Sequence, residues 1–100
     1  MRIVVLALAL VVPGCITDPS LFIDLRGNGA GTVVSDPEGI NCGRACAMVL
    51  TENNSVTLTA VPRTGSTFEG WSGGGCTGTE PCTTTLVNDT TIGAKFTVSP

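Results

Sequence analysis

The stretch VTLTAVPRTGSTFEGWSGGGC, residues 56–76, decides the fold of this chain. In its first half the apolar residues Val56, Leu58 and Ala60 alternate with threonines. An apolar residue at every second position is typical of a β-strand with one buried face. A proline then ends the strand because it has no amide hydrogen for a sheet, and PRTG, residues 62–65, has the order of a tight turn. The stretch therefore predicts a strand, a turn and the beginning of a second strand.

The same period of two recurs on both sides of this stretch. The strands expected from it are 21–26, 32–34, 47–50, 66–71, 83–87 and 92–96. We expect the first two to pair as a hairpin, because the Gly-Asn-Gly between them, residues 27–29, tolerates positive φ. No segment has a helical period, so the sequence predicts a mainly β fold, a small antiparallel β-sheet domain.

Large side chains are scarce, and this scarcity identifies the expected core. We expect Phe68, Trp71 and Phe96 to be buried, since exposing one of them would forfeit much of the apolar area available. An alternative places Trp71 on an exposed carbohydrate-binding face. A single tryptophan in a chain without tyrosine makes a poor sugar platform.

The composition excludes several classes of function. The chain has 100 residues, enough for one domain, with five basic and eight acidic residues and no histidine. The absence of a basic stripe disfavours nucleic acid and anionic bilayers as partners. Without histidine the usual general base and the commonest metal ligand are missing. We therefore expect no catalytic residue, no cofactor and no metal.

Two short motifs invite ligand-binding interpretations that the surrounding sequence disfavours. GNGAG, residues 27–31, is rich in glycine as phosphate loops are, but a β pattern follows it where a helix would be needed. SDPEG, residues 35–39, supplies two carboxylates, too few for a calcium site. We expect both motifs to be turns.

Four of the five cysteines form two close pairs, Cys42 with Cys46 and Cys76 with Cys82. Four cysteines allow three connectivities, and local pairing is favoured because both intervals are turns that contain glycine. Crossed pairing stays open, and it would constrain the unfolded chain more. A zinc site needs closer spacing than this, and a catalytic thiol needs a base that the chain lacks. The cysteines thus predict two local disulfides in a small exported domain.

The fifth cysteine, Cys15, follows an apolar run at residues 3–12 that is too short to span a bilayer and suits a secretory signal. VVPGC, residues 11–15, resembles the bacterial lipobox, in which the cysteine receives diacylglycerol and then a further acyl chain such as palmitate. We expect a lipoprotein signal peptide at 1–14, a lipidated tether at 15–20 and a β domain at 21–98. The alternatives are a generic signal peptide with an incidental cysteine and an N-terminal core strand.

With these residues in view, the chain resembles the divergent internalin B-repeat domain, a bacterial repeat domain, from about residue 21 to 98. The resemblance is carried by GNGAGTVVSDPEGINCGRAC, then by VTLTAVPRTGSTFEGWSGGGC, and by the closing IGAKF. It implies a small β module distantly akin to the β-grasp fold, and its loops fit bridges at 42/46 and 76/82. The glycines at 73–75 and Thr84 depart from the family pattern near the second bridge.

We therefore expect a membrane-anchored, non-enzymatic lipoprotein of the bacterial cell envelope, with one β repeat module for binding, adhesion or spacing. Its partners would be the lipid bilayer, through acylated Cys15, and an unidentified protein or cell-wall component, but no nucleic acid. Ile16 after the cysteine favours the outer membrane or cell surface over the inner membrane. The alternative function is a small periplasmic accessory lipoprotein that serves an envelope complex.

Overall fold

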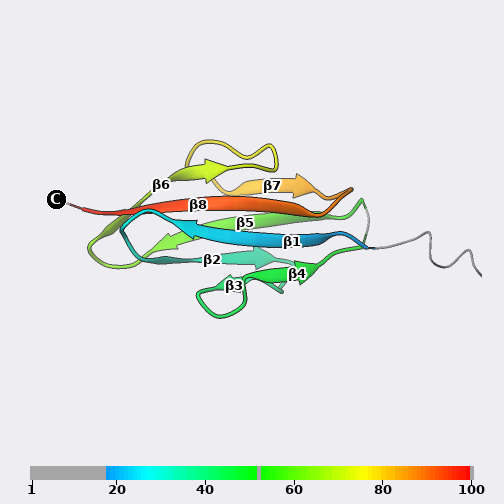
Figure 1. Ribbon diagram of the computed structural model, residues 1–100, viewed down its shortest axis with the longest axis horizontal. Coiled ribbons are helices and arrows are strands. Elements are labelled where there is room, and N and C mark those ends of the chain that lie inside the picture. The colour runs from blue at the N-terminus through cyan, green and yellow to red at the C-terminus, as the bar shows by residue number, and fades with distance from the viewer. Residues whose placement is uncertain (1–17, 52, 100) are drawn as a thin grey trace, which may run out of the picture.

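The computed structural model describes residues 18–51 and 53–99, and every regular element in them is a β-strand. Two four-stranded sheets pack face to face (Figure 1), with strand orders β4-β1-β8-β6, here called sheet A, and β3-β2-β5-β7, called sheet B. The strands are β1 (Ser20–Arg26), β2 (Gly31–Asp36), β3 (Asn41–Cys42), β4 (Ala47–Val49), β5 (Ser55–Pro62), β6 (Ser66–Ser72), β7 (Cys82–Thr85) and β8 (Thr90–Val98). The predicted mainly β fold is confirmed. Within residues 18–51 and 53–99 there is no helix that could cross a membrane.

The chain changes sheet at almost every connection. Only β2 and β3 are both consecutive and paired, whereas β1 lies between β4 and β8 in sheet A, and β2 lies between β3 and β5 in sheet B. The predicted hairpin between strands 21–26 and 32–34 is therefore wrong. Each sheet draws its strands from the whole sequence, so neither can form from a local segment.

The glycines at 27–29 explain why the hairpin does not form. The Gly29 N–H donates to the Phe96 carbonyl at 3.0 Å, and the Asn28 side-chain oxygen accepts from the Val98 N–H at 3.1 Å. A Cβ added at Gly29 would lie 2.6 Å from the backbone carbon of Thr97. The glycine thus permits a close approach to β8 while the chain leaves sheet A for sheet B, a use that the turn signal does not distinguish from a hairpin.

One core lies between the two sheets. It draws alternate residues from the long strands, among them Leu21 and Ile23 of β1, Val56 and Leu58 of β5, and Phe96 of β8. Each sheet turns one apolar face inward, as the period of two predicts.

The three aromatic residues predicted to be core form one cluster. Trp71 and Phe96 are buried, while Phe68 is partly buried and packs against both, with ring centroids 4.8 Å and 5.3 Å away. The prediction is confirmed for the two buried rings, and Phe68 lies at the margin of the core. Because Trp71 is only 6% exposed, it cannot serve as an open sugar platform.

The two ends of the described chain lie at opposite ends of the sandwich (Figure 1). At one end the Pro19 carbonyl accepts a hydrogen bond from the Leu50 N–H at 3.0 Å. At the other, the Ser99 N–H donates to the Gly65 carbonyl at 2.8 Å. Between these ends β1 and β8 run parallel, with six registered pairs from Leu21↔Thr90 onward. We call the end at Pro19 the entry end and the end at Ser99 the exit end.

Candidate functional site

The four cysteines of the domain pair locally, as predicted: Cys42 with Cys46 and Cys76 with Cys82, with Cα atoms 4.3 Å and 5.8 Å apart. Cys42 belongs to β3 and Cys82 to β7, which are the two outer strands of sheet B. The two pairs therefore lie at opposite edges of one sheet and cannot converge on one metal ion. The predicted lipid site, Cys15, and the signal peptide at 1–14 lie outside the described residues.

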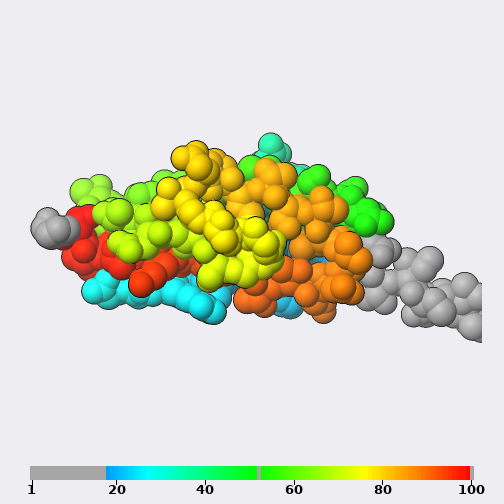
Figure 2. Space-filling view, turned by 90° about the horizontal axis from the view of Figure 1, so that it is seen from above, coloured from blue at the N-terminus to red at the C-terminus, as the bar shows by residue number. Residues whose placement is uncertain are grey.

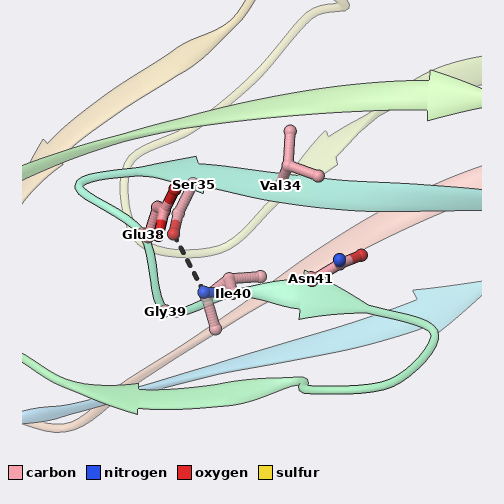
Figure 3. A pocket seen from close by; sticks show the side chains of 6 residues that line it. All are labelled: Val34, Ser35, Glu38, Gly39, Ile40 and Asn41. Carbon is pink, nitrogen blue, oxygen red and sulfur yellow. Dashed lines mark hydrogen bonds between the residues drawn. The ribbon is translucent and has the colours of Figure 1, made fainter.

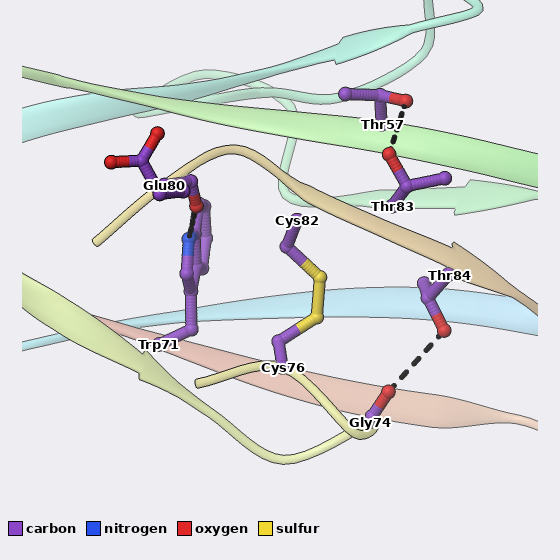
Figure 4. Close-up of a disulfide and its surroundings, with 8 residues drawn as sticks. All are labelled: Thr57, Trp71, Gly74, Cys76, Glu80, Cys82, Thr83 and Thr84. Carbon is purple, nitrogen blue, oxygen red and sulfur yellow. Dashed lines mark hydrogen bonds between the residues drawn. A yellow bond between two sulfur atoms is a disulfide. The ribbon is translucent and has the colours of Figure 1, made fainter. Parts of the chain in front are cut away.

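The bridge between Cys76 and Cys82 closes a loop that folds over Trp71 (Figure 4). The indole N–H of Trp71 donates to the Glu80 carbonyl at 2.7 Å, and the Trp71 backbone N–H donates to the Gly78 carbonyl at 3.0 Å. Figure 2 looks onto this edge of the sandwich, where the loop and β7 cover the core. Two backbone oxygens of the loop thus hold the tryptophan.

The bridge between Cys42 and Cys46 closes the connection from sheet B to sheet A. The Cys46 carbonyl accepts from the Ile23 N–H of β1 at 2.8 Å, beside the three residue pairs that join β1 to β4. Within the connection, Asn41 and Ala45 form an isolated bridge. The disulfide therefore holds β4 against β1 where the chain passes between the sheets.

A hollow of about 440 Å³ lies beside the β2–β3 connection and is lined by Val34, Ser35, Glu38, Gly39, Ile40 and Asn41 (Figure 3). The Ser35 hydroxyl accepts from the Ile40 N–H at 2.9 Å and donates to the Pro37 carbonyl at 2.7 Å. This hydroxyl braces the connection and is not presented as a nucleophile. This brace was not predicted from the sequence, although a serine shortly before a proline is a turn signal that could have identified it.

A second hollow lies on the outer face of sheet A, between Arg26, Lys95 and Glu69. Arg26 pairs with Asp24 at 2.9 Å, and both side chains are about half exposed. Glu69 accepts a hydrogen bond from the Thr97 hydroxyl at 3.1 Å. Basic and acidic groups alternate here, and exposed pairs of this kind contribute little free energy. The arrangement favours no single charge class of ligand.

The carboxylates of SDPEG, Asp36 and Glu38, are both exposed. Within 18–51 and 53–99, no three His, Cys, Asp or Glu side chains are grouped so as to hold a metal ion. GNGAG, the other glycine-rich motif, is used in the crossing from sheet A to sheet B. Neither motif forms a ligand cradle.

The outer strand β6 leaves backbone groups without a strand neighbour. Its ends are held, because the Ser66 N–H donates to the Arg63 carbonyl and Trp71 contacts the loop above it. Between them the pairing with β8 shifts at a bulge between Phe68 and Gly70. Bulges at an edge discourage pairing with a second chain while leaving side chains accessible. The bulge therefore makes the β6 edge a poor template for pairing with a second strand.

Comparison with known proteins identifies one family. The family model of the divergent InlB B-repeat domain matches residues 27–100, which include β2 to β8 but not β1. No curated protein and no solved structure matches the chain. Because the match spans well over half of the residues, the chain belongs to the divergent InlB B-repeat domain family, whose domains are bacterial surface modules of the adhesion type.

Proposed function

We propose that this chain is a lipid-anchored, non-enzymatic lipoprotein of the bacterial cell envelope, with one B-repeat module that binds a partner or acts as a spacer. The observation that carries the proposal is where the chain enters the domain. Ser20 donates its N–H to the Asp89 side chain at 2.8 Å, so the start of β1 is held at one end of the sandwich. Cys15 precedes Asp18 by three residues, a span of at most about 10 Å when extended.

The lipobox-like VVPGC supplies the chemistry of the anchor. Diacylglycerol on the Cys15 thiol, with a further acyl chain on the new amine, would bury many methylenes, each contributing about 0.8 kcal/mol. Two or three chains hold a small protein firmly on a membrane. The entry end would then lie close to the bilayer and the exit end would point away from it. Outer-membrane or surface localisation is part of the proposal.

The non-enzymatic role is supported by how the reactive side chains of the domain are used. All four cysteines of the domain are paired, and the Ser35 hydroxyl braces a turn. A contact role would use the loops at the exit end, because they are presented away from the anchor. The partner would be a protein or a cell-wall component.

The test is intact-mass analysis of the protein taken from bacterial envelopes, before and after reduction. The expected mass is that of a chain that begins at Cys15 and carries two or three acyl chains. On reduction this mass should rise by four hydrogens, as two disulfides require. A Cys15→Ser variant should lose the lipid and leave the membrane fraction while keeping both disulfides.

An envelope-derived protein with an unmodified Cys15 would overturn the anchor. Co-purification with one stoichiometric enzyme or assembly factor would instead support the periplasmic accessory lipoprotein. If the protein stays in the membrane fraction but no partner co-purifies with it, the module acts as a spacer.

A further inference from the structure

The parallel pairing of β1 with β8 places the first and last strands side by side. The six registered pairs run from Leu21↔Thr90 to Arg26↔Lys95. The chain enters β1 at the entry end and leaves β8 at the exit end (Figure 1). A pull on the two ends of the chain would therefore slide β1 and β8 past each other along their own axes.

Such a pull loads the hydrogen bonds between the two strands in shear. Bonds that lie across the pulling direction share the load and must fail together, whereas bonds pulled open from one end fail in sequence. The core adds resistance, because Leu21 and Ile23 of β1 and Ile92 of β8 are buried side chains that must leave their sites when the strands slide. Both strands are also held on their far sides, β1 by β4 and β8 by β6.

We propose that the β1–β8 ladder is a mechanical clamp, and that this module bears tension between its N-terminal attachment and whatever holds its exit end. The inference rests on the proposed function only for the source of the load, which is the anchor at Cys15. Neither disulfide crosses the ladder, since one closes 42–46 and the other 76–82. The clamp is therefore made of backbone hydrogen bonds and core packing alone.

The direction of each amide along β1 shows which bonds carry the load. The Ile23 N–H donates to Cys46 on the β4 side. Because successive amides of a strand point to opposite sides, the amide of exposed Asp24 faces β8 opposite Gly93. Asp24→Pro removes that amide from the clamp.

Thr59 offers a matched control in the other sheet. It is an exposed residue of a central strand, β5, and the nearby Arg63 N–H donates to Ala30 on the β2 side. By the same alternation the Thr59 amide faces β2, opposite Val34. Thr59→Pro therefore removes one amide from sheet B and none from the clamp.

The experiment is single-molecule pulling of the full oxidised chain in two geometries. In the first, handles on the two chain termini load the ladder in shear. In the second, one handle is at the N-terminus and the other on Asn88→Cys, an exposed turn residue just before β8, in a Cys15→Ser background. This second geometry peels β1 from β8 pair by pair from the entry end. The expected result is a higher unfolding force between the termini than in the peeling geometry.

Asp24→Pro should lower the force between the termini more than Thr59→Pro does, when the two variants have lost similar amounts of equilibrium stability. Equal forces in both geometries would overturn the clamp, as would an equal loss of force in the two variants. The geometry comparison needs no change in either strand, so it stands even if a proline variant fails to fold. Whether Cys15 is lipidated is tested separately, by the intact-mass analysis, so a failed lipid anchor and a failed clamp are distinguishable.

Discussion

Phe96 of β8 contacts both sheets. Its ring is 1% exposed and lies against Phe68 on its own sheet and against Gly31 of β2 in the opposite sheet. A Cβ added at Gly31 would lie 2.6 Å from Cζ and 2.7 Å from Cδ1 of this ring. The φ of Gly31 is not in the left-handed region, so its backbone conformation does not require glycine. Glycine is needed at this position because a side chain would collide with the Phe96 ring.

Gly31→Ala is accordingly expected to destabilise the domain by about 1–3 kcal/mol, the usual cost of overpacking a filled core. The methyl group must displace the Phe96 ring or separate the sheets. Urea denaturation measures the loss. Ala30→Ser, at the exposed neighbouring position, should change the free energy of unfolding by less than about 0.5 kcal/mol. If the two variants were equally stable, the close packing of Gly31 on Phe96 would be refuted.

Among the elements, β1 has the most consequential position, since it joins β4 to β8 and supplies Leu21 and Ile23 to the core. The family match begins at residue 27 and leaves this strand out. In this protein sheet A would be split without it, and β8 would lose its parallel neighbour. The domain as a folding unit therefore starts before the matched region.

A chain that starts at residue 27 is expected not to fold, whereas a chain that starts at residue 18 should. Burying one leucine or isoleucine contributes about 1.5–3 kcal/mol, so losing two such residues and a ladder removes much of the stability of a small domain. Dispersion of amide signals in NMR spectra distinguishes the two outcomes. A well-dispersed spectrum from the shorter chain would show that β1 is an accessory strand.

The loop closed by Cys76 and Cys82 is the element that covers Trp71, which is the only tryptophan of the chain. Replacing both cysteines with serine should cost about 2 kcal/mol by the chain-entropy estimate for a short loop. It should also shift the tryptophan fluorescence to longer wavelength, because the loop that contacts the indole through the Glu80 carbonyl would open and water would reach the ring.

The matched control for this loop is the double serine variant of Cys42 and Cys46, at the opposite edge of sheet B. Its loss of stability should be similar, because its loop is also short, but the emission wavelength of the folded protein should not move. A shift of equal size in both variants would mean that the emission reports general loosening, not the cover over Trp71.

At the scale of the whole molecule, charge is unevenly distributed along the long axis. Four carboxylates lie toward the entry end, and the four described basic residues lie toward the exit end or midway. The carboxylates are Asp18, Asp36, Glu38 and Asp89, and the basic residues are Arg26, Arg44, Arg63 and Lys95. An anchored domain would thus turn its acidic end to the bilayer, and anionic lipids would repel it.

This repulsion is measurable when Cys15 is coupled to a lipid in vesicles. Energy transfer from Trp71 to a membrane dye should be weaker on anionic than on neutral vesicles at low salt. The difference should vanish near 1 M salt, where the screening length is about 3 Å. The double variant Asp18→Asn, Asp89→Asn should reduce the difference between anionic and neutral vesicles. The fold should be kept, because the side-chain oxygen of an asparagine at position 89 can still accept from the Ser20 N–H. A transfer efficiency that is independent of lipid charge would contradict the expected orientation.

The sequence by itself determined most of the strands, the turn at 62–65 and the burial of Trp71 and Phe96, and it favoured the local disulfides. Each of these depends on neighbours within a few positions: a period of two in residues 56–60, a proline and glycine turn at 62–65, and glycine between paired cysteines. Such signals are local, so they can be identified without knowing the rest of the fold. They also suffice to indicate the family and its surface role.

Only the tertiary structure decided which strands pair. The glycines at 27–29 suit a hairpin and a crossing between sheets equally well, and the choice was made by Phe96 and its neighbours in β8, far along the chain. The parallel pairing of β1 with β8 follows from the need to bury two apolar faces against each other. That need is a property of the whole chain, and no local pattern encodes it, so the proposed clamp could not be inferred from sequence.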